Sequence, residues 1–191
     1  MKQQYARLVT TAAWTATIVA TLLLIVKVIT WWVTGSVSLL ASLIDSMLDI
    51  AASVVNLVVV RYALQPADRE HTFGHGKAES LAALAQAMFI SGSAVFLILN
   101  GIDRFFRPHA LHAPELGVYV SLFAIVVTLG LVMFQKHVVR VTGSQAIAAD
   151  SLHYQTDLYM NAAIMVALGL SYFGVTQADA VFAIGIGVFI L

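Results

Sequence analysis

Six long apolar runs, separated by short polar stretches, divide the chain. A bilayer core of about 30 Å is crossed by about 20 helical residues, and five of the runs reach that length. The pattern predicts an all-α membrane protein, a bundle of six transmembrane helices in which short connections join antiparallel neighbours. The runs lie near residues 8–33, 38–63, 79–106, 115–140, 146–173 and 177–191.

The sixth run is shorter than the others. From Gln177 to Leu191 a helix would extend for about 22 Å, which is less than the thickness of the hydrocarbon core. No charged residue marks its end. We therefore expect residues 1–191 to be the transmembrane domain of a longer protein.

The composition supports a membrane protein and excludes several other classes. Hydrophobic residues make up 60% of the chain and charged residues only 10%, whereas about a quarter of the residues of a soluble domain are charged. The ten basic residues balance the ten acidic ones, so no basic field indicates nucleic-acid binding. Because there is no cysteine, a metal would have to be held by histidine and carboxylate.

The basic residues are concentrated on one side of the predicted membrane. Cytoplasmic segments are usually enriched in Lys and Arg, which predicts a cytoplasmic N-terminus. Lys27 is an exception because it lies within the first run; it is either a partner for a carboxylate or a side chain that extends to the membrane surface. The predicted inner residues are Lys2, Arg7, Arg61, Arg69, Lys77, Lys136 and Arg140, and the predicted outer ones are Arg104 and Arg107.

Two apolar runs contain pairs of potential metal ligands, Asp45 with Asp49 and His153 with Asp157. Residues four apart share one face of a helix. Three Asp side chains exposed to lipid would cost on the order of 10 kcal/mol, so such groups normally face a partner, a cavity or an ion. Two opposed faces would supply three carboxylates and one imidazole, a set that suits tetrahedral Zn²⁺, with Cd²⁺, Fe²⁺, Co²⁺ or Mn²⁺ as competitors. The alternative is that these are unrelated polar groups at helix interfaces.

These ligands favour transport over catalysis. A site with four protein ligands leaves no position for an activated water, and no His-Glu-x-x-His sequence is present. We therefore predict that the chain is not an enzyme. Metal binding requires a neutral His153 and ionised Asp side chains, so protons compete with metal for the same groups and proton influx could drive metal export. The alternative is a non-transporting membrane metal sensor or scaffold, in which bound metal braces a dimer.

A second polar cluster, Asp68, His71 and His75, lies between the second and third runs. Gly74 and Gly76 give the backbone the freedom to fold these three side chains onto one ion. The spacing alone favours an ordinary solvated loop.

The two ligand pairs, together with the sequences GSVSLLA at 35–41 and GHGKAE at 74–79, resemble the cation diffusion facilitator family, and closely its bacterial zinc and ferrous-iron efflux branch. The resemblance covers essentially the whole chain. It implies a homodimer in the bacterial inner membrane that exchanges cytoplasmic Zn²⁺, with Cd²⁺ or Fe²⁺, for external protons by alternating access. It also implies a C-terminal soluble domain, which is absent from this chain.

The resemblance also assigns residues. It implies that Asp45, Asp49, His153 and Asp157 form the transport site, and that Asp68, His71 and His75 hold a second zinc with a regulatory or structural role. An Asp at position 45 resembles members that accept cadmium as well as zinc. Lys77 resembles a residue that makes a contact across the dimer near the cytoplasmic surface.

Overall fold

In the computed structural model, residues 2–34, 37–106, 114–172 and 177–191 are described. They contain six helices and no strand, which confirms the all-α prediction, and each predicted apolar run corresponds to one helix. The first helix starts earlier than its run because the polar N-terminal residues continue it. The helices are α1 (Lys2–Thr34), α2 (Val37–Ala63), α3 (Lys77–Phe106), α4 (Pro114–Thr142), α5 (Gln145–Tyr172) and α6 (Ala178–Ile190).

Four helices, α1 to α4, contain segments long and apolar enough to cross a membrane. The apolar sequence of α5 is interrupted in its first half by Asp150, His153 and Asp157. The apolar segment of α6, Ala180–Ile190, is shorter than a span. That α5 and α6 also cross the membrane remains a prediction.

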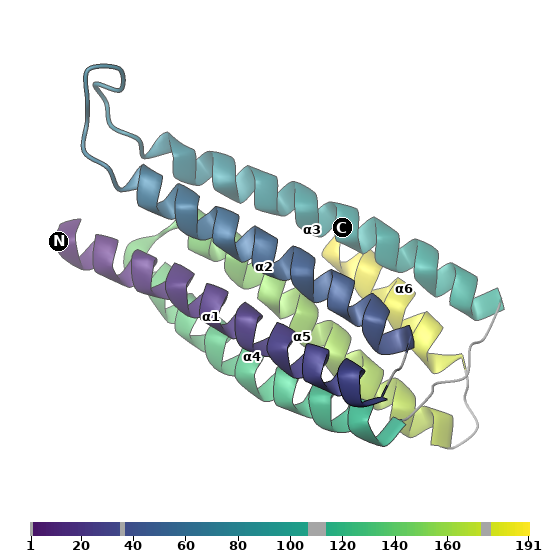
Figure 1. Ribbon diagram of the computed structural model, residues 1–191. Coiled ribbons are helices and arrows are strands. Elements are labelled where there is room, and N and C mark those ends of the chain that lie inside the picture. The colour runs from purple at the N-terminus through teal and green to yellow at the C-terminus, as the bar shows by residue number, and fades with distance from the viewer. Residues whose placement is uncertain (1, 35–36, 107–113, 173–176) are drawn as a thin grey trace.

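The helices form two groups (Figure 1). α1 packs against α2 and α4, and α4 packs against α5, so these four make one bundle. α3 and α6 lie side by side as a pair, and α5 contacts both of them. Because α5 is shared between the groups, side chains on it can be reached from α2 on one side and α3 on the other.

Glycines allow the close approach of α3 and α6. A methyl group added at Gly187 would lie 2.5 Å from Ile98 Cγ1 and 2.9 Å from the Ala94 carbonyl oxygen, and one at Gly101 would lie 2.8 Å from Ile184 Cγ1. In a membrane, small residues at such contacts let helix backbones approach and gain van der Waals packing.

Tyr154 ties the four-helix bundle together. Its side chain is buried, and its hydroxyl lies 2.6 Å from Ser53 Oγ of α2 and donates to the Ala16 carbonyl of α1 at 3.2 Å. The hydroxyl therefore satisfies buried polar groups on two other helices, which fixes the rotation of α5 in the bundle.

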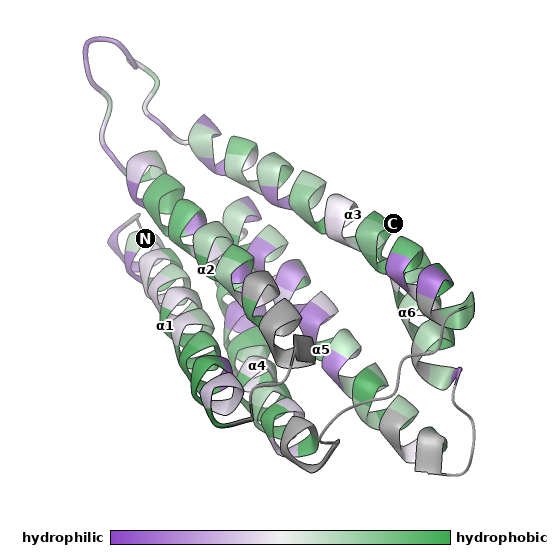
Figure 2. Ribbon diagram, turned by 45° about the vertical axis from the view of Figure 1, so that its right-hand side comes forward, coloured by the Kyte–Doolittle hydropathy of each residue, from purple (hydrophilic) through white to green (hydrophobic). Residues whose placement is uncertain are grey.

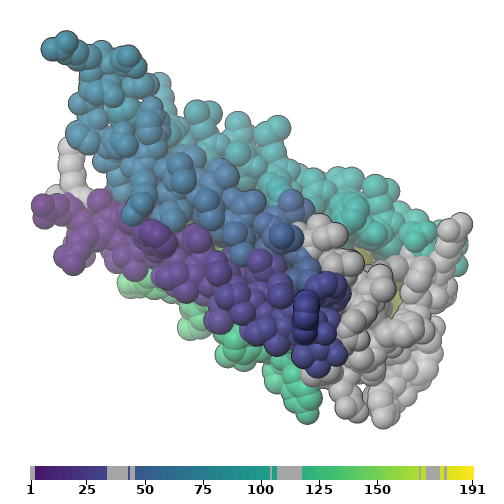
Figure 3. All heavy atoms as spheres, viewed as in Figure 1, coloured from purple at the N-terminus to yellow at the C-terminus, as the bar shows by residue number. Residues whose placement is uncertain are grey.

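The N-terminus, the α2–α3 loop and the α4–α5 turn gather at one end of the molecule (Figure 1). Glu79 at the start of α3 accepts hydrogen bonds there from Tyr5 of α1, at 2.8 Å, and from Ser144 of the α4–α5 turn. Gly143, with φ +68°, lets α4 end in that turn. The α2–α3 loop projects beyond the helix ends (Figure 3). Below this loop, the hydrogen bonds of Glu79 connect α3 to α1 and to the α4–α5 turn.

Candidate metal sites

Asp49 on α2 and His153 and Asp157 on α5 lie together within the bundle. His153 Nε2 is 3.1 Å from Asp49 Oδ1 and 3.5 Å from Asp157 Oδ2. One ligand atom from each residue lies within 4.8 Å of the others. The structure thus brings together three of the four residues that the sequence singled out.

These separations match those of a tetrahedral zinc site. Bonds of about 2.0–2.1 Å at tetrahedral angles place neighbouring ligand atoms about 3.3 Å apart. The two measured contacts of His153 lie on either side of that value. The shorter contact is also a hydrogen bond, so either a metal ion or a proton on Nε2 can join the imidazole to the Asp49 carboxylate.

The surroundings of the cluster hold His153 in place and leave the carboxylates accessible. The imidazole is buried between Phe89 of α3, at 5.7 Å between ring centroids, and Tyr154, at 5.4 Å. The Asp49 and Asp157 side chains are 21% and 30% exposed. Figure 2 shows hydrophilic segments along α5, which lies among the other helices.

Asp45, the fourth predicted ligand, lies one helical turn before Asp49 in the sequence of α2. Its side chain is outside the described part of the structure, so its place in the site stays a prediction.

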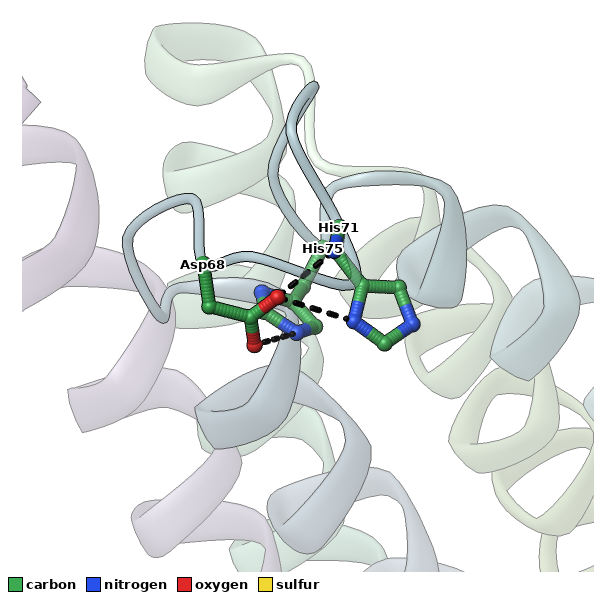
Figure 4. Close-up of side chains that lie close together, drawn as sticks. All are labelled: Asp68, His71 and His75. Carbon is green, nitrogen blue, oxygen red and sulfur yellow. Dashed lines mark hydrogen bonds and ion pairs between the residues drawn. The ribbon is translucent and has the colours of Figure 1, made fainter.

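The loop between α2 and α3 gathers the second predicted set (Figure 4). His71 Nδ1 lies 3.3 Å from Asp68 Oδ1, and His75 Nε2 lies 3.4 Å from Asp68 Oδ2. The three residues meet the same 4.8 Å criterion as the first cluster. Two imidazoles and a carboxylate leave one tetrahedral position for water or another ligand.

Local backbone contacts explain why the loop brings these side chains together. Asp68 Oδ1 accepts the backbone N–H groups of His71, at 2.6 Å, and Glu70, at 3.0 Å. The bond from His71 is the main reason that the pKa of the Asp68 carboxyl lies below its usual value of 3.8. Gly74, with φ +80°, supplies a left-handed turn before His75.

His75 is the buried member of the loop cluster. Only 5% of the residue is exposed, and its ring packs edge-on against Tyr62 at 4.5 Å. Its Nδ1 is buried with no hydrogen-bond partner, while Nε2 faces Asp68. The ring is therefore positioned by packing, which directs Nε2 toward the cluster.

Other polar residues of the helices mainly serve the packing. Asp150 is buried and accepts a hydrogen bond from Gln135 of α4 at 2.7 Å, and the Asn161 amide donates to the Asp157 backbone carbonyl at 2.8 Å. Lys77 is the first residue of α3 and is exposed, so its predicted contact across a dimer stays a prediction. Spacing along the sequence did not identify the Gln135–Asp150 pair because its members lie on different helices.

A known protein family matches most of this chain. Residues 13–191 match the cation efflux transmembrane domain. The chain belongs to the cation diffusion facilitator family. This family consists of transporters, so the prediction that the chain is not an enzyme is confirmed at the level of the family.

Members of the cation diffusion facilitator family resemble this chain along its whole length. The cation-efflux pump FieF of Pectobacterium atrosepticum is 66% identical over 191 residues, that of Klebsiella pneumoniae 64% and that of Yersinia enterocolitica 63%. Each alignment covers 100% of this chain and 64% of the relative. The chain thus spans just under two thirds of the length of these curated relatives, and the predicted bacterial branch is confirmed.

Proposed function

We propose that the chain is the membrane domain of a proton-coupled exporter of divalent metal. Its substrate is Zn²⁺, with Cd²⁺ or Fe²⁺ as further substrates, and it carries the ion out of the cytoplasm by alternating access. Membership in a cation efflux family supports transport of cations. The observation that carries the assignment of the site is the approach of His153 to both Asp49 and Asp157 within a membrane helix bundle.

Competition for the same atoms supplies the coupling. A bound metal requires a neutral His153 and ionised carboxylates, whereas a proton on Nε2 lets the imidazole donate a hydrogen bond to Asp49. Each bound proton therefore opposes metal binding. A proton gradient directed inward can thus displace metal on the outer side.

The distribution of charge sets the proposed orientation. The end of the molecule that carries the N-terminus and the α2–α3 loop also carries most of the basic residues, so we place it in the cytoplasm of a bacterium, with the helices in the inner membrane. Described basic residues at this end are Arg7, Arg61, Arg69, Lys77, Lys136 and Arg140.

The loop cluster is proposed as a second zinc site with a structural or regulatory role. It lies outside the apolar part of the helices, and Asp68 and His71 are both exposed. A zinc ion bound there would stiffen the loop without lying on the path through the bundle. His71→Ala is expected to remove one equivalent of bound zinc from the purified protein.

A homodimer is the proposed assembly. The resemblance to the family supports it, and α3 offers an exposed apolar surface that includes Leu84, Met88 and Phe96. Apolar residues on the outward side of a helix contact either lipid or a second copy of the chain.

Zinc flux in proteoliposomes tests the transport function. The purified chain is reconstituted with an imposed pH gradient, and zinc and proton movements are followed with two dyes. Zinc is expected to move against protons, and Asp157→Asn is expected to abolish both movements. Asp103→Asn is the matched control because it makes the same change in an exposed carboxylate of α3 and should leave the flux unchanged.

Three outcomes would contradict the proposal in different ways. Equal flux by Asp157→Asn and the unchanged chain would remove the assignment of the site. Stoichiometric zinc binding without sustained flux would support the sensor or scaffold instead. Zinc flux that is insensitive to the direction of the pH gradient would exclude proton coupling while leaving metal transport intact.

A further inference from the structure

Lys27 is a cationic residue in the last third of α1, and it is not among the predicted metal ligands. Its Nζ donates to Ser46 Oγ of α2 at 2.6 Å, and Ser46 is only 3% exposed. The lysine is itself half-buried. Its ammonium therefore lies against α2 within the protein, and extension to the membrane surface does not describe this side chain.

The direction of the side chain is consistent with that contact. Lys27 precedes the end of α1 at Thr34 by seven residues, and Ser46 follows the start of α2 at Val37 by nine. Along antiparallel helices these positions lie about 10 Å and 14 Å from the shared end, so the side chain reaches toward the middle of the bundle. Helical side chains tilt toward the N-terminus of their helix, which in α1 is the same direction.

This position places the ammonium near the transport site. Ser46 is three residues before Asp49 on α2, a rise of about 4.5 Å along the helix axis. The ammonium thus contacts α2 about one helical turn along the helix axis from Asp49, on the side away from the α2–α3 loop. In the orientation proposed above, that is the outer side.

A fixed positive charge at this distance acts on any ion in the site. It repels a divalent cation, and burial limits the screening of that repulsion by salt. It also attracts the carboxylates and so offsets part of their charge when no metal is bound. Both effects weaken metal binding relative to a site without the lysine.

Resting on the function proposed above, we propose that Lys27 is an internal cation that weakens divalent metal at the Asp49–His153–Asp157 site and thereby speeds its release. The lysine is a positioning and affinity-setting residue and does not bind the ion. An exporter gains from this arrangement because slow dissociation of a tightly held ion would limit turnover.

Zinc titration of charge-altered variants tests the inference. The measurements use the full chain with His71→Ala as a common background, so that the loop cluster contributes little. Lys27→Met removes the charge and keeps most of the side-chain volume. This variant should bind zinc about tenfold tighter or more, because a charge that is partly shielded from water interacts strongly with a nearby ion. Flux at saturating zinc should fall because release is slower. Lys27→Arg keeps the charge and should bind zinc within about threefold of the background.

Two controls separate the charge from a packing role. Lys136→Met removes a lysine from an exposed position far along α4 and should leave zinc affinity unchanged. Thermal unfolding of each variant measures how much stability is lost with the hydrogen bond to Ser46. If Lys27 had only a packing role, this loss of stability would be the only effect of the substitution. If Lys27→Met does not fold, Lys27→Gln is titrated in its place, with the same expectation.

The results separate this inference from the proposed function. Zinc affinity of Lys27→Met that is unchanged or weaker than the background would overturn the role of the lysine and leave the transport site standing. The same tightening in Lys27→Arg would show that charge is not the cause and would also overturn it. Absence of zinc binding by the background chain at this cluster would instead remove the proposed transport site.

Discussion

The packing of α3 against α6 makes a sharp prediction for Gly187→Ala. The added methyl group would lie 2.5 Å from Ile98 Cγ1 and 2.9 Å from the Ala94 carbonyl oxygen. Because one of these atoms belongs to the backbone of α3, a change of side-chain rotamer cannot relieve the contact. The two helices must move apart, and overpacking of this kind costs about 1–3 kcal/mol.

Gly185 provides a matched control two residues away on the same helix. A methyl group added there meets nothing within 4 Å. Ala is favoured over Gly within a helix by about 0.5–1 kcal/mol, so Gly185→Ala should stabilise the protein slightly. Because this gain applies to both variants, they should differ by the overpacking cost, about 1–3 kcal/mol in the free energy of unfolding.

Thermal unfolding in detergent, followed by circular dichroism, measures the difference. For a chain of this size each kcal/mol moves Tm by about 2–4 °C, so Gly187→Ala should unfold roughly 2–12 °C below Gly185→Ala. Adding Ile98→Ala to Gly187→Ala removes the nearest atom and should recover part of the loss, less the cost of the deleted side chain. A Tm for Gly187→Ala equal to or above that of Gly185→Ala would refute the close packing of α3 and α6.

Two further predictions concern Tyr154 and Asp68. Tyr154→Phe leaves buried Ser53 and the Ala16 carbonyl without this partner and should lower the free energy of unfolding by about 1–3 kcal/mol, whereas Tyr159→Phe at a 44% exposed position should change it by less than about 0.5 kcal/mol; equal effects in a thermal melt would contradict the buried network. The pKa of Asp68, followed by NMR in the metal-free chain, should lie below 3.8 because backbone N–H groups stabilise its carboxylate. Since the folded pKa is depressed, these bonds support the loop above pH 3.8 and are lost as the pH falls through the lower value; a measured value at or above 3.8 would show that the loop does not hold the carboxylate in this way.

Local sequence determined the helices and the candidate chemistry. The length of each apolar run fixes where a helix can cross a bilayer, and six helices formed where six runs were predicted. Spacing of four residues put His153 and Asp157 on one face of α5, because helical geometry alone decides that relation. The loop cluster was also visible as three potential ligands within a short stretch, although its spacing did not distinguish a metal site from a solvated loop.

Tertiary structure decided which of these faces meet. In a membrane helix nearly every side is apolar, so hydrophobic periodicity does not show which side turns inward, and packing of small residues and buried hydrogen bonds makes the choice. The pairing of α3 with α6 depends on glycines that fit a particular partner, and the approach of Asp49 to His153 joins residues 104 positions apart. The contact of Lys27 with Ser46 was not visible in the sequence, because the direction of a long side chain depends on the neighbouring helix.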